Sequence, residues 1–126
     1  MTDRQTVLVV EDDSAVRRMY RTALSFAGFD VIEAEDAIKA LRFLDQDVPD
    51  IVILDLLLPT LSGLAVQQEI AAHPQTANIP VIIVTGSDMS LDHVEVPCVL
   101  RKPVSPDRLV ATVRNCLASG ARSVPS

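Results

Sequence analysis

The hydrophobic residues of this chain fall into short apolar runs separated by amphipathic segments. Short runs made largely of Val, Ile and Leu are typical of strands that are buried on both faces. These runs alternate with helix-like segments along the chain, which favours a parallel sheet covered by helices on both faces. The predicted strands are Val7–Val10, Phe29–Ala34, Ile51–Leu54, Val81–Val84 and Cys98–Arg101.

The amphipathic segments carry apolar residues at helical spacing, and most begin at a residue that can cap the first turn. Ser14 can cap the first segment and Asp36 the second, and Ser105-Pro106-Asp107 is a strong start signal for the last. We predict helices from Ser14 to Gly28, from Asp36 to about Leu44, over Gly63–Ala72, and from Pro106 to about Ala118.

The stretch Gly86–Pro97 does not fit this alternation, because it offers at best one or two helical turns where a crossover helix is needed. The fourth helix is therefore expected to be short or replaced by a loop. The 126 residues otherwise predict one domain, 1–126, with a core over 6–118. The tail 119–126 is small and polar enough to fray.

Composition narrows the possible partners. Hydrophobic residues make up 48% of the chain but aromatic residues only 3%, so the core is expected to be aliphatic. No run approaches the ~20 apolar residues of a membrane span, and the start MTDRQ is not a signal peptide, so we expect a soluble cytoplasmic protein. The net charge of −6 argues against direct nucleic-acid binding and suits a divalent cation or a basic partner.

Polar residues follow four of the predicted strands at the point where each strand ends. They are Glu11 and Asp12, Asp55, Thr85, and Lys102. The carboxyl ends of parallel strands share one edge of a sheet, so these side chains are expected to converge on one crevice.

Carboxylates crowded at such an edge repel one another unless a cation lies between them. Magnesium suits this place, because it takes oxygen ligands and is usually held by one or two carboxylates plus a phosphoryl oxygen. With an amine from Lys102 and a hydroxyl from Thr85, the site predicts a cage for a tetrahedral anion. We interpret it as a site for phosphoryl transfer to a carboxylate.

The motifs VLVVEDD, DIVILDLLLPTLSG, VIIVTG and RKP, in this order and spacing, resemble the receiver domain of two-component response regulators. The resemblance spans Val7 to Leu117 and implies a CheY-like, flavodoxin-like sheet of five parallel strands in the order 2-1-3-4-5. It implies that Asp55 accepts the phosphoryl group and that Asp12 binds Mg²⁺ directly. It also implies that Glu11 acts on the metal through a water, and that the backbone carbonyl of Leu57 is a ligand.

The same resemblance implies that Thr85 and Lys102 contact the phosphoryl group, and that the Lys102-Pro103 bond is cis. Two features depart from the family pattern and concern signal output. Val99 stands where an aromatic switch residue is common, and Thr85 lies closer to Lys102 in the sequence than is usual.

The function implied is a Mg²⁺-dependent signalling receiver, which takes a phosphoryl group from a histidine kinase or a phosphotransfer protein and then switches binding of a downstream protein. It is not an enzyme beyond its own phosphorylation and dephosphorylation. A haloacid-dehalogenase type enzyme would need a second aspartate two residues after Asp55, where Leu57 stands. The alternative is a pseudo-receiver, a binding module that is not phosphorylated. Whether the chain is free-standing or part of a larger protein stays open.

The remaining polar and apolar candidates receive structural interpretations. Asp13 and Asp36 are expected to be helix caps, Asp50 a solvated loop residue, and His73 and His93 exposed and uninvolved. Cys98 and Cys116 lack C-x-x-C spacing and are expected to be buried thiols rather than a disulfide. Met19, Tyr20 and Phe26 are expected to be core or partly covered helix residues.

Overall fold

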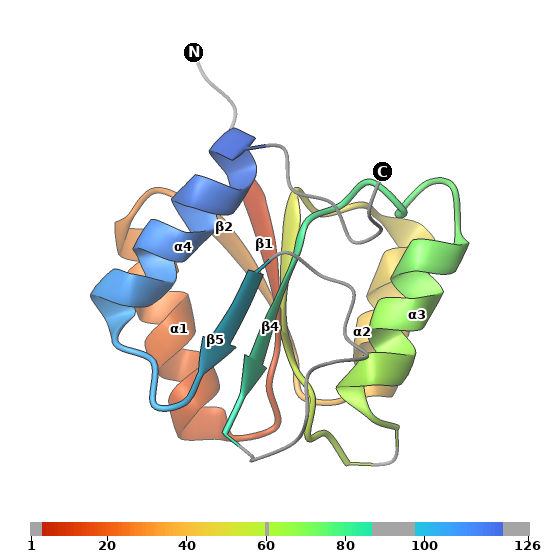
Figure 1. Ribbon diagram of the computed structural model, residues 1–126, viewed down its shortest axis with the longest axis horizontal. Helices are drawn as coiled ribbons and strands as arrows, with labels where there is room; N and C mark the ends of the chain where they lie inside the picture. The colour runs from red at the N-terminus through yellow and green to blue at the C-terminus, as the bar shows by residue number, and fades with distance from the viewer. Residues whose placement is uncertain (1–3, 60, 87–97, 120–126) are drawn as a thin grey trace.

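The five apolar runs form one sheet in which every strand is parallel to its neighbours (Figure 1). A computed structural model of the chain describes residues 4–59, 61–86 and 98–119. The strands follow the order β2-β1-β3-β4-β5, which confirms the predicted fold. Their bounds are β1 Thr6–Val10, β2 Asp30–Ala34, β3 Ile51–Asp55, β4 Val81–Thr85 and β5 Cys98–Arg101.

The described helices cover the sheet on both sides (Figure 1). α1 (Ser14–Phe26) and α4 (Pro106–Ser119) lie on one face, and α2 (Ala37–Gln46) and α3 (Gly63–Ala72) lie on the other. The label α4 denotes the last described helix. The expected short helix or loop between β4 and β5 falls on 87–97, and the tail on 120–126, so both lie outside the described residues.

Each strand supplies side chains to two separate aliphatic cores, because successive residues of a strand point to opposite faces. In β1, Val7 and Val9 pack with α1 and α4, whereas Leu8 and Val10 pack with α2 and α3. All four residues are fully buried. This two-sided burial explains why the central strands β1, β3 and β4 are nearly continuous apolar runs, whereas the edge strand β2 also carries charged residues.

The helix ends show one wrong prediction. Ser14 does not cap α1, whereas Asp13, which was also expected to be a cap, does: its carboxylate accepts hydrogen bonds from the backbone N–H groups of Ala15 and Val16 at 2.9 and 3.1 Å. Ser14 is already the first helical residue. The expected caps Asp36 and Ser105 are confirmed by bonds to the third residue beyond each.

One exposed residue differs from expectation. Phe26 is 95% exposed, so its interpretation as a covered residue is wrong, whereas Tyr20 is in the core. Asp50 is exposed and lies in the loop before β3, as expected, and its carboxylate also accepts the Thr6 backbone N–H at 2.7 Å. His73 is exposed as expected, but its Nε2 lies 3.0 Å from Glu69. His93 lies outside the described residues.

The expectation of two free thiols is also wrong, because a disulfide joins Cys98 to Cys116. Cys98 is the first residue of β5, and Cys116 lies in α4 with 2% of its surface exposed. Both side chains belong to the core between the sheet and the α1–α4 layer. The spacing of the two cysteines in the sequence could not reveal this contact, because the contact arises from the packing of α4 on one face of the sheet.

Across the described residues, the helices are too short or too polar to cross a membrane.

Candidate functional site

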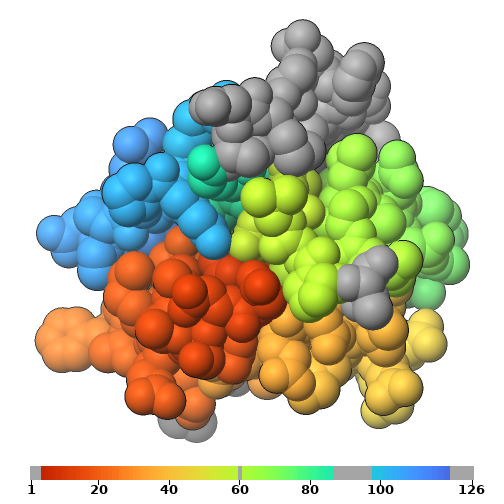
Figure 2. Space-filling model, turned by 90° about the horizontal axis from the view of Figure 1, so that it is seen from below, coloured from red at the N-terminus to blue at the C-terminus, as the bar shows by residue number. Residues whose placement is uncertain are grey.

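The strand ends that were expected to converge do so. The chain around residues 11–15 (red-orange), 56–59 and 61–63 (yellow-green) and 101–106 (blue) meets on the side of the molecule seen in Figure 2. Glu11 and Asp12 directly follow β1, Asp55 and Thr85 are the last residues of β3 and β4, and Lys102 directly follows β5. The sheet therefore collects all five polar residues at one edge.

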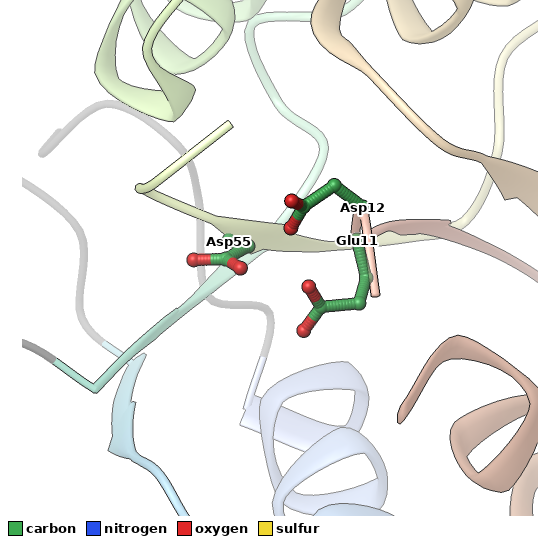
Figure 3. A group of neighbouring side chains, drawn as sticks. All are labelled: Glu11, Asp12 and Asp55. Carbon is green, nitrogen blue, oxygen red and sulfur yellow. The ribbon is translucent and has the colours of Figure 1, made fainter. Parts of the chain in front are cut away.

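Three carboxylates face one another at the centre of this edge (Figure 3). Glu11 is 1% exposed and Asp55 is 4% exposed, whereas Asp12 lies on the surface. One oxygen from each of the three lies within 4.8 Å of the others. Two buried acids and one exposed acid thus form a single acidic cluster.

Lys102 neutralises part of this charge. Its amine donates a hydrogen bond to Glu11 Oε1 at 2.6 Å and another to Asp55 Oδ2 at 3.0 Å. Its backbone N–H donates to the carbonyl of Thr85 at 2.9 Å, so β4 and β5 stay paired up to the site. The Lys102-Pro103 bond is cis, as the family resemblance implied. Thr85 itself is fully buried at the end of β4.

One amine is shared by two buried carboxylates at this site. Burial is the largest cause that raises the pKa of Glu11 to about 7; the nearby Asp55 acts in the same direction, and the hydrogen bond from Lys102 lowers the pKa in part. Burial lowers the pKa of Lys102, but its two carboxylate partners outweigh burial and raise the pKa above the ordinary value. Lys102 therefore stays charged, and Glu11 is the group that responds to pH.

Two donors orient the Asp55 carboxylate. Asp55 Oδ1 accepts the backbone N–H of Leu57 at 3.0 Å, while its Oδ2 accepts the amine of Lys102. Both oxygens are thus oriented by donors at opposite sides. Leu57 is 55% exposed and lies directly beside Asp55. The proposed metal-binding role of its carbonyl stays a prediction.

Sequence reasoning missed Arg17, a residue of α1 that holds the loop after β1, which carries Glu11 and Asp12, in place. Its guanidinium donates to the backbone carbonyl of Glu11 at 2.9 Å and to Glu33 on β2 at 3.2 Å. Arg17 thereby ties the loop after β1 to the neighbouring strand. The sequence signal for this role is the position of Arg17 one turn into the first helix. The signal is weak, because many arginines at such positions are simply exposed to solvent.

Sequence reasoning also missed the role of Gly63. A Cβ added to this first residue of α3 would lie 2.0 Å from the backbone oxygen of Asp55 and 2.7 Å from the Cα of Leu56. The Gly63 N–H donates to the Leu56 carbonyl at 2.9 Å. α3 can therefore begin directly against Asp55 only because Gly63 has no side chain. The glycine directly at a predicted helix start was the available signal.

The donor set fits a magnesium ion. Mg²⁺ prefers oxygen ligands at 2.0–2.1 Å in an octahedron, so oxygens bound to one ion lie at most about 4.2 Å apart. The 4.8 Å spread of the three carboxylates is slightly wider than this limit, and Asp12 is the exposed member of the set. Asp12 and Asp55 are therefore suited to hold the ion, which would supply positive charge to the oxygens of a phosphoryl group.

The chain is similar to proteins of one signalling family. The family model described as response regulator receiver domain matches residues 7–114. PhoB, the phosphate regulon transcriptional regulatory protein of Pseudomonas aeruginosa, is 32% identical over 118 residues, which cover 90% of this chain and 52% of PhoB. RpaA of Synechocystis, named a DNA-binding dual master transcriptional regulator, is 33% identical over 116 residues, which cover 88% of this chain and 48% of RpaA.

These two relatives are longer, so the chain spans about half the length of the curated relatives it matches. Among solved structures, the chemotaxis response regulator CheY4 of Vibrio cholerae superimposes with a TM-score of 0.83 at 25% identity, covering 90% of this chain and 98% of CheY4. The family match and the structural likeness agree with the order of the strands. The chain belongs to the response regulator receiver domain family.

Proposed function

We propose that this receiver domain accepts a phosphoryl group on Asp55, with Mg²⁺ bound beside it. The observation that carries the proposal is the convergence of Glu11, Asp12 and Lys102 on the Asp55 carboxylate. Asp12 and Asp55 are proposed as direct metal ligands, Glu11 as a ligand through water, and Leu57 as a ligand through its carbonyl. No residue of this set is missing, which does not favour a pseudo-receiver.

The proposed reaction transfers a phosphoryl group from a phosphohistidine to the aspartate. A carboxylate oxygen of Asp55 forms a bond to phosphorus, the phosphorus–nitrogen bond breaks, and the departing imidazole keeps the electron pair and takes a proton from water. Lys102 already donates to Asp55, so its charge is placed to offset the negative charge of the transferred group. Thr85 is proposed to contact the phosphoryl group through its hydroxyl.

The proposed phosphodonor is a sensor histidine kinase or a histidine phosphotransfer protein, and the proposed output is altered binding of a downstream protein. The net charge of −6 makes nucleic acid an unsuitable direct partner for this domain. PhoB and RpaA are named as transcriptional regulators but are about twice as long. Nucleic-acid binding by a longer protein that contains this domain is therefore a separate question.

We also propose a cytoplasmic location.

Intact-mass spectrometry after incubation with acetyl phosphate and Mg²⁺ tests the proposal. We expect one added phosphoryl group, which is absent in Asp55→Asn and absent without metal. Asp45→Asn is the matched control, because Asp45 is an exposed aspartate on α2, and it should behave as the native chain does. No adduct on a folded protein, or an equal adduct in Asp55→Asn, contradicts the proposal.

A further inference from the structure

The Cys98–Cys116 disulfide fastens the strand β5 to the helix α4, which follows it in the chain. Cys98 is the first residue of β5 and Cys116 lies near the end of α4, with a sequence separation of 18. The strand and the helix lie side by side and run in opposite directions (Figure 1). The bridge therefore closes this strand–helix unit at the end that lies away from the turn between its two elements.

The turn at the other end of the unit carries Lys102. This residue directly follows β5, and its amine donates to the carboxylates of Glu11 and Asp55. Its backbone N–H donates to the Thr85 carbonyl at 2.9 Å. β5 is thus anchored at both ends, by the acidic site at one end and by the disulfide at the other.

β5 is held less firmly than the central strands of the sheet. It has four residues, which pair with Ile82 to Thr85 of β4, and it stands at the end of the strand order. Leu100 is the one buried residue of β5, whereas every residue of β3 and β4 is buried. Short, partly exposed elements open locally at a lower free energy than the core of a fold.

The disulfide restricts this local opening. Without the bridge, β5 can detach from β4 while α4 stays packed on the core through Leu109 and Val113. With the bridge, Cys98 must stay at Cys116, so the detached strand can explore only the conformations of a short closed loop. Oxidation thus lowers the population of the open state, and Lys102 follows the strand that opens.

We propose that Cys98 and Cys116 form a reversible thiol–disulfide site, whose oxidation fixes β5 and with it the position of Lys102. Disulfides of cytosolic proteins are usually transient and often sense the redox state, because cellular thiols keep most cysteines reduced. In the proposed cytoplasmic location, the pair is expected to be reduced under ordinary conditions and to close under oxidising conditions. The inference rests on the proposed function only where it concerns phosphorylation.

The exchange with a dithiol reductant transfers two electrons and two protons. One thiolate of the dithiol attacks the sulfur of Cys98, which is the more exposed of the two cysteines. The bond between Cys98 and Cys116 breaks, and Cys116 leaves with the electron pair and takes a proton from water. The second thiolate of the dithiol attacks the sulfur of the first, and Cys98 leaves and is protonated in the same way. The reductant ends as a disulfide, and a small-molecule disulfide reverses the steps.

A redox titration of the folded chain tests whether the site is reversible. The protein is equilibrated with mixtures of reduced and oxidised dithiothreitol, and its thiols are then alkylated and counted by mass. We expect the bridged fraction to depend on the ratio of the two forms of dithiothreitol, and to be the same from an oxidised or a reduced starting sample. A bridge that opens only when the protein is unfolded, or a reduced chain that does not close it again, overturns the proposal.

Hydrogen exchange of the oxidised and the reduced protein tests the effect on β5. The Lys102 amide should exchange at least about tenfold faster after reduction, because a bridge across a loop of this length contributes more than a tenfold change requires. The Asp30 amide of β2 is the matched control: it is bonded to the Gln5 carbonyl at 3.0 Å, and local opening there leaves both cysteines in place. An equal change at the two amides would mean that the bridge stabilises only the whole fold, which overturns the proposal.

The double variant Cys98→Ala and Cys116→Ala separates the bridge from other effects of the reductant. Its Lys102 amide should exchange at the faster rate with or without dithiothreitol. A dependence on dithiothreitol in this variant would contradict the assignment of the effect to the bridge. Circular dichroism of the variant and of the reduced native protein confirms that both are folded.

The initial rate of phosphorylation by acetyl phosphate tests whether the bridge reaches the site. We expect the reduced protein to react several-fold more slowly than the oxidised protein, because Lys102 is held less firmly beside Asp55. Equal rates overturn the link between the disulfide and the site. If neither form is phosphorylated while the exchange of the Lys102 amide still depends on the redox state, the proposed function fails and the redox site stands.

Discussion

The side chains of Glu11 and Lys102 meet at 2.6 Å although 91 positions separate them in the chain. Glu11 follows β1 and Lys102 follows β5, and two strands lie between them in the sheet. The long lysine side chain reaches across the ends of those strands and contacts Asp55 on the way, at 3.0 Å. A single amine thus offsets two buried carboxylates, while Asp12 adds a third negative charge nearby.

The first prediction is that the metal-free protein loses stability as pH rises from about 5 to about 8. The pKa of Glu11 is about 7 in the folded protein and 4.5 without the fold, so the folded state binds the proton more tightly. The resulting stabilisation is present below pH 4.5 and disappears as pH rises through 7. Its upper bound is about 3 kcal/mol, at 1.36 kcal/mol for each pKa unit.

Urea unfolding in the presence of a chelator, at several pH values, measures this effect. Other groups also titrate in this range, so the decisive quantity is the difference from Glu11→Gln, which cannot ionise. We expect a flatter pH dependence in the variant. If the free energy of unfolding changes with pH by the same amount in the two proteins, Glu11 is not the group whose titration changes the stability.

The second prediction is that Mg²⁺ raises the melting temperature, and that Asp12→Ala raises it in the absence of metal. A ligand that binds only the folded state stabilises it by about 2.7 kcal/mol at ~100 times its dissociation constant. Removing Asp12 relieves repulsion among the three carboxylates but also removes a proposed metal ligand. Mg²⁺ should then change the melting temperature of the variant very little. Asp45→Ala, on α2, should keep the full response to Mg²⁺. Melting curves that coincide with and without millimolar metal would contradict a preformed site.

The third prediction is that Gly63→Ala destabilises the protein by about 1–3 kcal/mol or more, as overpacking does. In an open helix the same change would stabilise by up to ~1 kcal/mol, so the sign of the effect reports the close approach to Asp55. Phosphorylation by acetyl phosphate should also slow, because α3 must move away from the acceptor residue. Gly86→Ala is the control, since its added Cβ would lie 3.4 Å from the Lys102 side chain, an ordinary contact. A stabilised Gly63→Ala would disprove the steric account.

The fourth prediction concerns Arg17. Arg17→Met should cost about 1–3 kcal/mol, because the Glu11 carbonyl and the Glu33 carboxylate lose a charged donor. It should also weaken Mg²⁺ binding, since the loop that carries Asp12 is less constrained. Arg21 contacts Glu33 as well but is 59% exposed, so Arg21→Met should be close to neutral. Equal effects of the two substitutions on unfolding and on a Mg²⁺ titration would show that Arg17 acts only as a surface charge.

The fifth prediction is that the purified, air-oxidised protein contains no free thiol. Alkylation under denaturing conditions followed by mass measurement should find Cys98 and Cys116 unmodified until a reductant is added. Reduction should lower the free energy of unfolding by about 3 kcal/mol, the value for a closed loop of about this length. The double variant Cys98→Ser and Cys116→Ser should be insensitive to the reductant. Two alkylated cysteines without reductant would restore the free-thiol interpretation.

Local patterns in the sequence predicted the elements well, because strand and helix formation depends on short-range periodicity and caps. The bounds of α3 and β5 are those expected, and β1, β3 and β4 differ only by one polar residue at an end. These added residues are informative: Asp55 and Thr85 are the last paired residues of their strands rather than the first residues of loops. The acidic edge was predictable for the same reason, since parallel strands must end together.

The sequence by itself determined which polar groups meet at the sheet edge, because the alternation of strands and helices indicates a parallel sheet, and the strands of such a sheet end at one edge. Only the tertiary structure decided how those groups interact and what surrounds them. Five features depend on distances between elements: the raised pKa of Glu11, the hydrogen bond of Arg17 to the loop after β1, the close approach of the backbone to Gly63, the Cys98–Cys116 disulfide and the exposure of Phe26. Such distances are set by how helices pack on the sheet, to within an ångström, and periodicity along one segment carries no information about them.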